Sequence, residues 1–367
     1  VINNSVVTGD GTMTVNANTG DLTFGGGITN NGGIIFTGDN DTTIGDAISG
    51  AGAVIKNGNG MLDLTVASTY SGGTTLASGT IRLGDDAALG TGVLTINGGT
   101  LNANGDRTIA NDIELNNDVT IAGSNFDFSG AVTNTGTNIL TIDNTQTEFS
   151  GNITGGGIGK EGSGLLILSG SNTLTSLGVS EGTVRLDNTA AVAGDTAVTI
   201  SGTSLLDNNA GGDLTIDSLA GDAGATFDTG GFKVTIDGAS TTTFAGTITN
   251  VGLGEVEHTG TGQLTLSGDN TYNGPTTITA GTVAITGSVD GNVEVNGGTF
   301  IIGADDAIED GDSLIINSGN LQSNNDARNL SSGVDVTVKG DFAITGTNDL
   351  QLSGDVDLTA GSRTITT

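Results

Sequence analysis

The sequence predicts an all-β fold, a parallel β-helix in which short strands wind into the successive coils of a β-solenoid. Three observations carry this prediction. Apolar residues alternate with polar residues in short runs, which is the period of a strand with one buried face. Glycine, asparagine and aspartate separate those runs at turn positions. A long-period repeat covers most of the chain, and because no run has sustained helical periodicity, we expect almost no helix.

The most complete coil lies at residues 260–285 and reads GTGQLTLSGDNTYNGPTTITAGTVAI. It contains three alternating runs separated by two corners that carry glycine, asparagine or aspartate. The same pattern recurs at residues 58–83 and 162–186. Each of these stretches therefore predicts a strand, a corner, a second strand, a second corner and a third strand.

The repeat has a period of about 100 residues, because its closing Gly-Thr pairs begin at Gly79, Gly182 and Gly281, which are 103 and 99 residues apart. Residues 305–321 match residues 85–101, so a fourth copy begins near the C-terminus and we expect the sequence to be a piece of a longer polypeptide. We predict one continuous rod of about 17 coils, with about 22 residues per coil and a length of roughly 80 Å. The predicted super-repeats are 1–57 (partial), 58–160, 161–257 and 258–367 (truncated).

This repeat resembles the passenger-associated strand repeat of bacterial autotransporters and related giant surface adhesins. Copy 58–83 keeps fewer of its positions, and copy 162–186 has Leu174 in place of the tyrosine. The resemblance implies a right-handed parallel β-helix on the cell surface or outside the cell, and it implies no particular activity. The positions that carry it in copy 260–285 are Leu264, Leu266, Gly268, Asn270, Thr271, Tyr272, Gly274, Thr276, Gly281 and Thr282.

Composition raises disorder as an alternative, because 65 of the 367 residues are glycine and the formal net charge is −32. The apolar residues fall in alternating strand patterns, which favours a folded chain. With 10 Phe, 2 Tyr and no Trp, the core should be mainly aliphatic. We expect stacked copies of these side chains to form ladders, with corner asparagines stacking likewise. The residues predicted to face inward are Leu64, Val66, Leu76, Ile81, Leu83, Leu94, Ile96, Leu166, Leu168, Val184, Leu186, Leu264, Leu266, Ile278, Val283 and Ile285.

Charge and cysteine content exclude several classes of function. The chain has 41 acidic and 9 basic residues, which disfavours binding to nucleic acid or to anionic membrane surfaces. It has no cysteine, so disulfides and thiolate metal sites are excluded. No apolar run approaches the ~18 residues of a transmembrane helix. The first interpretation of the acidity is that it keeps an edge-exposed β structure soluble.

The basic residues at repeat positions are interpreted as scaffold. His258 is the only histidine, but Lys56 and Lys160 occupy the corresponding place in the other copies, two residues before a Gly-x-Gly turn. Arg82 and Arg185 likewise share one place, and we expect their guanidinium groups to pair with local aspartates.

Acidic residues raise catalysis and calcium binding as alternatives. Enzymes that cleave polysaccharides use pairs of carboxylates. An active site is expected to be a single, unrepeated group of residues in a cleft, whereas acidic residues occur throughout this chain. We therefore predict no catalytic residue. The competing interpretation of the acidity is that calcium binds in corner loops, because hard cations prefer oxygen ligands. The candidate loops are residues 38–41, 207–213 and 324–328, and the sequence does not identify the individual ligands. We expect no other cofactor. The acidic pairs are Asp85-Asp86, Asp305-Asp306 and Glu309-Asp310.

Three functions remain open from the sequence. The first is a non-enzymatic, extracellular stalk or adhesin segment that contacts a host or neighbouring cell surface. The second is a filament or surface-layer subunit whose copies stack end to end through open strand edges. The third is a polysaccharide-degrading β-helix enzyme, which is disfavoured because no cleft loop or basic cluster is evident.

Overall fold

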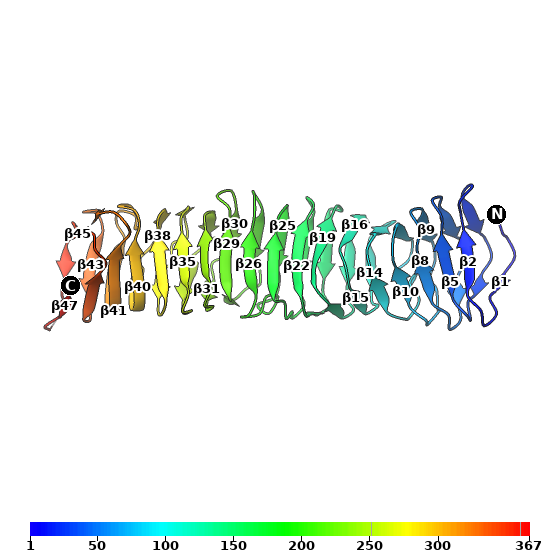
Figure 1. Cartoon of the computed structure of the whole chain (residues 1–367), viewed down its shortest axis with the longest axis horizontal. Coiled ribbons are helices and arrows are strands. Elements are labelled where there is room, and N and C mark those ends of the chain that lie inside the picture. The colour runs from blue at the N-terminus through cyan, green and yellow to red at the C-terminus, as the bar shows by residue number, and fades with distance from the viewer. Residues whose placement is uncertain (251, 360) are drawn as a thin grey trace. The chain divides into compact units, whose positions relative to one another are not determined.

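A computed structural model of the protein describes residues 1–250, 252–359 and 361–367. The chain divides into two compact units: unit 1 is Val1–Thr175 with Gly182–Val184, and unit 2 is Ser176–Glu181 with Arg185–Thr367. Within each unit, parallel strands stack as the coils of a β-solenoid, and the described residues contain no helix (Figure 1). The predicted fold class, an all-β parallel β-helix, is confirmed. Because the described residues form only strands and turns, none of them belongs to an apolar helix that could cross a membrane.

In unit 1 the strands of each sheet pair in parallel with their counterparts on the neighbouring coils. One sheet contains β2 (Met13–Asn16), β5 (Ile34–Thr37), β8 (Val54–Lys56), β10 (Thr74–Leu76), β12 (Leu94–Ile96), β15 (Ile113–Leu115), β18 (Val132–Asn134) and β21 (Ile153–Thr154). A second series contains β3 (Leu22–Phe24), β6 (Thr42–Ile44), β9 (Met61–Leu64), β11 (Thr80–Leu83), β13 (Thr100–Ala103), β16 (Val119–Gly123), β19 (Thr137–Ile142) and β22 (Gly157–Glu161). The third face has β1 (Val6–Val7), β4 (Ile28–Thr29) and β7 (Ile48–Ser49), and later β14 (Arg107–Ile109), β17 (Phe126–Phe128), β20 (Gln146–Phe149) and β23 (Leu165–Leu168).

Unit 2 follows the same plan. One series contains β24 (Ser176–Val179), β26 (Ala197–Ile200), β29 (Ser218–Gly221), β32 (Thr241–Phe244), β35 (Gln263–Leu266), β38 (Thr282–Ile285), β44 (Phe342–Thr345) and β47 (Ile365–Thr366). A second contains β28 (Leu214–Ile216), β31 (Lys233–Ile236), β34 (Glu255–His258), β37 (Thr276–Ile278), β43 (Asp335–Val338) and β46 (Val356–Asp357), and the long strands β40 (Val293–Ile302) and β41 (Ser313–Ser323) join both series. The remaining strands are β25 (Thr183–Leu186), β27 (Leu205–Asn208), β30 (Thr226–Asp228), β33 (Thr247–Thr249), β36 (Asp269–Asn270), β39 (Ser288–Val289), β42 (Arg328–Leu330) and β45 (Leu350–Leu352).

The strand register measures the length of each coil. Val54 pairs with Thr74, and Thr74 with Leu94, a step of 20 residues each time. Steps between paired strands range from 19 to 22 residues in unit 1, and from 17 in the pairing of Thr276 with Val293 to 23 elsewhere in unit 2. Most coils are therefore shorter than the predicted 22 residues, because glycine at positive φ turns the chain within a few residues.

The core consists of side chains that stack in register from coil to coil. Phe24, Ile44, Leu64 and Leu83 occupy successive coils of one ladder, and all four are buried. Fifteen of the sixteen residues predicted to face inward are buried, which confirms the aliphatic ladders. Corner asparagines also stack, since Asn116 Nδ2 donates a hydrogen bond to Asn97 Oδ1 at 3.1 Å.

Val66 is the exception, and its predicted inward position is wrong. Strand β9 ends at Leu64, and Val66 lies in the bend that follows, where it is only half-buried. Alternation places side chains on one face only while the backbone stays extended, so the rule fails beyond the end of the strand.

Candidate functional site

The lysines at the equivalent repeat corners lie inside the solenoid. Lys56 and Lys160 are buried, and each Nζ donates a hydrogen bond to the carbonyl oxygen of the glycine two residues later, Gly58 or Gly162. Each ammonium thereby provides a donor to a backbone carbonyl in a tight turn. Burial lowers the pKa of Lys56, and the charge of Asp41 opposes that change. The burial and contacts of these side chains fit the scaffold role, which stays a prediction.

His258 occupies the same corner in the third copy and is also buried. Its Nε2 lies 3.1 Å from the carbonyl oxygen of Gly262, to which an Nε2–H donates. Its Nδ1 is buried and has no hydrogen-bond partner among the described residues. The histidine therefore supports one turn carbonyl, and neither of its ring nitrogens bonds to an acidic side chain among the described residues.

The closing glycine of each repeat packs directly onto this corner. Gly79, Gly182 and Gly281 have φ of 73°, 74° and 60°, a left-handed backbone that favours glycine. A Cβ at Gly79 would lie 2.1 Å from the carbonyl oxygen of Gly58, and one at Gly281 would lie 2.3 Å from that of Gly260. The Gly-Thr pair that defines the repeat in the sequence thus has a steric cause.

The repeat arginines pair with aspartates, as predicted. Arg82 Nη2 lies 2.5 Å from Oδ2 of Asp63, its register partner on the preceding coil, and Arg185 Nη2 lies 2.6 Å from Asp187 Oδ2. The Asp63 side chain is buried, so this pair joins two coils from within the surface layer.

The acidic pairs bind backbone and hydroxyl donors. Asp85 Oδ1 accepts a hydrogen bond from the N–H of Ala87 at 2.9 Å, and Asp305 Oδ1 accepts one from the N–H of Asn329 at 3.0 Å. Asp310 Oδ1 accepts one from a serine hydroxyl at 2.5 Å. These carboxylates hold turns and join coils, while the absence of catalytic residues stays a prediction.

The segments proposed for calcium use their oxygens in the same way. Asp41 Oδ1 accepts the N–H of Met61 at 2.9 Å, and Asp213 Oδ1 accepts the N–H of Lys233 at 3.0 Å. In the part of the chain that the structure describes, no group of three or more His, Asp or Glu side chains is placed to hold a metal ion. Calcium binding stays a prediction without named ligands.

Stacked carboxylates repel one another along unit 2. Asp207 pairs in register with Asp228, and burial, followed by the charge of Asp228, raises the pKa of Asp207. Burial, followed by the charge of Asp217, likewise raises the pKa of Asp237. The parallel register thus brings like charges together on successive coils.

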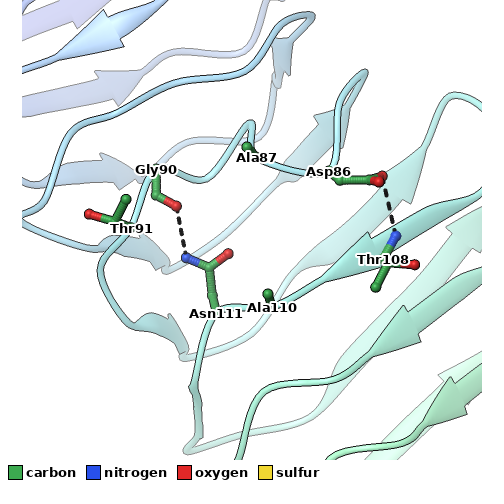
Figure 2. Close-up of a pocket in the computed structure, with 7 residues that line it drawn as sticks. All are labelled: Asp86, Ala87, Gly90, Thr91, Thr108, Ala110 and Asn111. Atoms are coloured by element: carbon green, nitrogen blue, oxygen red, sulfur yellow. Dashed lines mark hydrogen bonds between the residues drawn. The ribbon is translucent and has the colours of Figure 1, made fainter.

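A pocket of about 370 Å³ opens in unit 1 beside the loop that follows β11. Asp86 Oδ1 accepts the N–H of Thr108 at 3.2 Å on one side, and Asn111 Nδ2 donates to the carbonyl of Gly90 at 3.2 Å on the other (Figure 2). The same Nδ2 also donates to the carbonyl of Gly92 at 2.7 Å. The loop is anchored by Ala88 and Leu89, which are buried. The residues that line the pocket are Asp86, Ala87, Gly90, Thr91, Thr108, Ala110 and Asn111.

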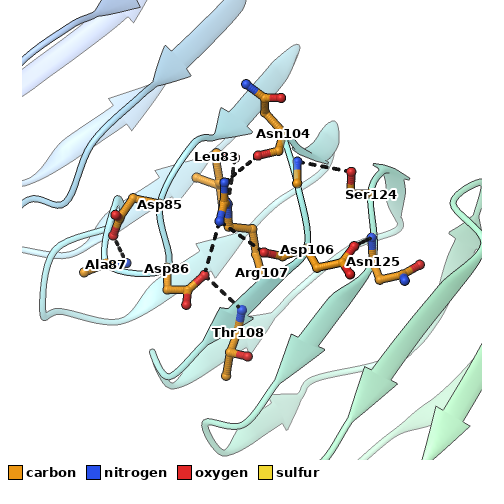
Figure 3. A network of polar contacts seen from close by, with 11 residues as sticks. Leu83, Asp85, Asp86, Ala87, Asn104, Asp106, Arg107, Thr108, Ser124 and Asn125 are labelled. Carbon is orange, nitrogen blue, oxygen red and sulfur yellow. Dashed lines mark hydrogen bonds and ion pairs between the residues drawn. The ribbon is translucent and has the colours of Figure 1, made fainter.

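Arg107 is held at the edge of this region by backbone oxygens. Its Nε donates to the carbonyl of Leu83 at 3.3 Å, its Nη1 to the carbonyl of Asp106 at 3.1 Å, and its Nη2 to the carbonyl of Asn104 (Figure 3). Its Nη1 also lies 3.7 Å from Asp86 Oδ1. The guanidinium therefore joins the loop after β11 to the next coil.

A second pocket of about 250 Å³ shares Asp86 and Thr108 with the first. Asp127 and Glu148, which are in register on β17 and β20, lie along it. Below it, Phe126, Phe128 and Phe149 stack in the core with ring centroids 5.1 and 4.9 Å apart, a local exception to the aliphatic interior. The other residues that line it are Asp106, Arg107, Asn125, Phe126 and Gln146.

Residues 54–83, 159–186 and 256–285 match the Passenger-associated-transport-repeat family. The chain carries three passenger-associated-transport repeats. It is also similar to the adhesin BmaC autotransporter of Brucella suis biovar 1 (strain 1330), with 37% identity over 114 residues. The match covers 30% of this chain and 3% of the length of that relative. No solved structure matches the chain significantly.

The passenger-associated-transport repeats include the buried basic corner and its closing glycine, but not the two pockets. Sequence reasoning named Asp86 as half of an acidic pair and did not single out Thr108, Asn111 or Arg107. A further signal for this region was Arg107, one of nine Lys and Arg residues in the chain, which lies outside all three repeats.

Proposed function

We propose that this chain is a non-enzymatic, extracellular segment of a bacterial surface adhesin, a rigid β-solenoid stalk whose outer faces contact partners. The observation that carries the proposal is the presence of three passenger-associated-transport repeats in a chain similar to an autotransporter adhesin. The chain spans about 3% of that relative, so the activity and partners of the whole protein remain part of the proposal.

The energetics of the coils support a structural role. Each coil buries aliphatic side chains against its neighbours, and backbone hydrogen bonds run between successive strands of every series. Such a stack resists bending, because bending would separate paired strands on one face. The acidic side chains at the corners hold backbone donors, which supports display in preference to catalysis.

Surface location is tested on intact bacteria that produce the protein. Antibody raised against this chain should label intact cells, and protease added outside the cells should remove the signal while a cytoplasmic marker survives. Labelling that appears only after the cells are broken open would overturn the proposed location.

Adhesion is tested with beads coated with the purified chain. Coated beads should adhere to cultured epithelial cells or to extracellular matrix more than beads coated with the heat-unfolded chain. The enzymatic alternative is assayed in parallel on a panel of acidic polysaccharides, with Asp305→Asn and Asp306→Asn as variants. Turnover that these variants abolish would replace the adhesin proposal. The filament alternative stays a prediction, and light scattering across a concentration series measures it.

A further inference from the structure

We propose that the pocket beside Asp86 binds a basic side chain, lysine or arginine, from an extended cationic segment of a partner protein. The proposal rests on the proposed function, in which outer faces contact partners, and it adds the chemistry of one partner. Four features of unit 1 support the proposal: the acceptors that the pocket presents, the bonds already made by the nearby Arg107, the small apolar floor of the pocket and the second pocket that adjoins it.

The pocket presents hydrogen-bond acceptors. Asp86 Oδ1 accepts the Thr108 N–H, and its Oδ2 has no donor among the described residues. Asn111 Nδ2 donates to two carbonyls, so its Oδ1 remains as an acceptor. A ligand that fits these groups must bring donors, and a lysine or arginine head brings three or five of them.

The nearby cation does not offer a binding site for an anion. Arg107 donates to the carbonyls of Leu83, Asp106 and Asn104 through all three nitrogens. These bonds use three of its five N–H groups, and a carboxylate or sulfate ligand at the remaining ones would be repelled by the Asp86 carboxylate, whose Oδ1 lies 3.7 Å from Nη1. The net charge of −32 also repels anions and attracts cations from a distance.

The floor of the pocket suits the stem of a long side chain. Ala87, Gly90 and Ala110 contribute only methyl groups and backbone to the lining. Lysine and arginine cover such small apolar surfaces with their methylene stems while the charged head reaches polar groups at the rim. A volume of about 370 Å³ accommodates one such side chain.

The second pocket extends the site for a further basic residue. Asp106, Asp127 and Glu148 line it, and Asp127 and Glu148 are register partners one coil apart. In an extended peptide, alternate side chains point the same way about 6.6 Å apart, so a second lysine two positions on can reach these carboxylates. A neutral glycan fits less well, because the ring of Phe126 is buried and provides no stacking platform.

The test measures binding of a fluorescein-labelled peptide of alternating lysine and serine to the full chain by fluorescence anisotropy. Asp86→Asn and, separately, Ala110→Leu, which fills the floor at an exposed position, should each weaken binding about fivefold, the effect of one exposed charge pair. The matched control is Asp305→Asn. This variant makes the same change of charge as Asp86→Asn. Like Asp86, Asp305 accepts a hydrogen bond from a backbone N–H, that of Asn329, but it lies outside both pockets.

Binding should weaken as salt is raised, and a glutamate-serine peptide should not bind. Circular dichroism of each variant checks that it is folded. The proposal would be overturned if the wild type, Asp86→Asn and Ala110→Leu bound the lysine-serine peptide with equal affinity. It would also be overturned if the wild type bound a neutral oligosaccharide and Ala110→Leu abolished that binding. Beads that adhere to cells equally well with wild type and Asp86→Asn would reject this pocket while leaving the adhesin proposal intact.

Discussion

The corners at Lys56 and His258 build the same turn with different chemistry. The nitrogen of each side chain lies beside a glycine carbonyl of its own turn, Gly58 for Lys56 and Gly262 for His258. The lysine also reaches the carbonyl of Ser78 at 3.4 Å, whereas the histidine leaves its buried Nδ1 unpaired. The comparison indicates that the corner needs a buried donor and tolerates a change in its charge and shape.

The largest expected effect tests what the two corners have in common. Gly79→Ala and Gly281→Ala should each destabilise the chain by about 3 kcal/mol or more, because the new Cβ would meet a carbonyl oxygen 2.1 or 2.3 Å away. Gly211→Ala is the control: its φ is 73°, like that of Gly79, but a Cβ there has no atom within 4 Å. It should cost only about 1 kcal/mol for the left-handed backbone. Urea unfolding followed by circular dichroism measures all three, and equal losses would show that backbone strain, not packing, fixes these glycines.

The second prediction separates the two corners. Lys56→Met should cost about 2 kcal/mol, because it leaves the carbonyls of Gly58 and Ser78 without this donor. His258→Leu should cost about 1 kcal/mol or less, because it removes an unsatisfied nitrogen together with one hydrogen bond. Urea unfolding of the two variants measures this difference. Equal decreases in their urea midpoints would contradict the prediction.

The lysine corner should also depend on pH. Burial lowers the pKa of Lys56 below the value of 10.5 that it has when exposed. Between the two values the unfolded chain binds more protons than the folded chain, so the contribution of Lys56 to stability rises with pH up to about 10.5. The wild type should therefore gain stability relative to Lys56→Met as pH rises through that window. Burial raises the pKa of Tyr70 and of Tyr272, which lowers stability above pH 10 in both proteins and cancels in their difference.

The comparison also shows how far a sequence with repeats can be interpreted. Alternation and the 100-residue period predict the strands and inward residues, because each coil obeys one local rule and contacts its neighbours in register. The equivalence of His258 with Lys56 identifies a scaffold position, since a shared place in the repeat requires a shared structural cause. The pocket at Asp86 and Asn111 could not be predicted, because it depends on how the loop after β11 lies against the following coil. The prediction that Val66 faces inward is wrong for the same reason, since the neighbouring coils determine where strand β9 ends.

The last prediction concerns a buried tyrosine–threonine pair that the repeats of Lys56 and His258 share. Tyr70 and Tyr272 are fully buried, and their hydroxyls bond to Thr74 and Thr276 at 2.5 and 2.6 Å. Thr74 also donates to a backbone carbonyl at 3.3 Å, whereas Thr276 has no second partner among the described residues. Tyr272→Phe should therefore cost about 1.5 kcal/mol and Tyr70→Phe only about 0.5 kcal/mol, because the first change leaves a buried hydroxyl unsatisfied.

The second repeat provides the control for this pair, because it has leucine at both positions, Leu174 and Leu177, and buries both. The double variant Tyr272→Phe/Thr276→Val should recover part of the stability lost in Tyr272→Phe, since replacing both polar partners by apolar groups of the same shape removes the unsatisfied group. Urea unfolding of the single and double variants gives the coupling between the two positions. A double variant less stable than Tyr272→Phe would show that an unsatisfied Thr276 hydroxyl is not the cause of the loss.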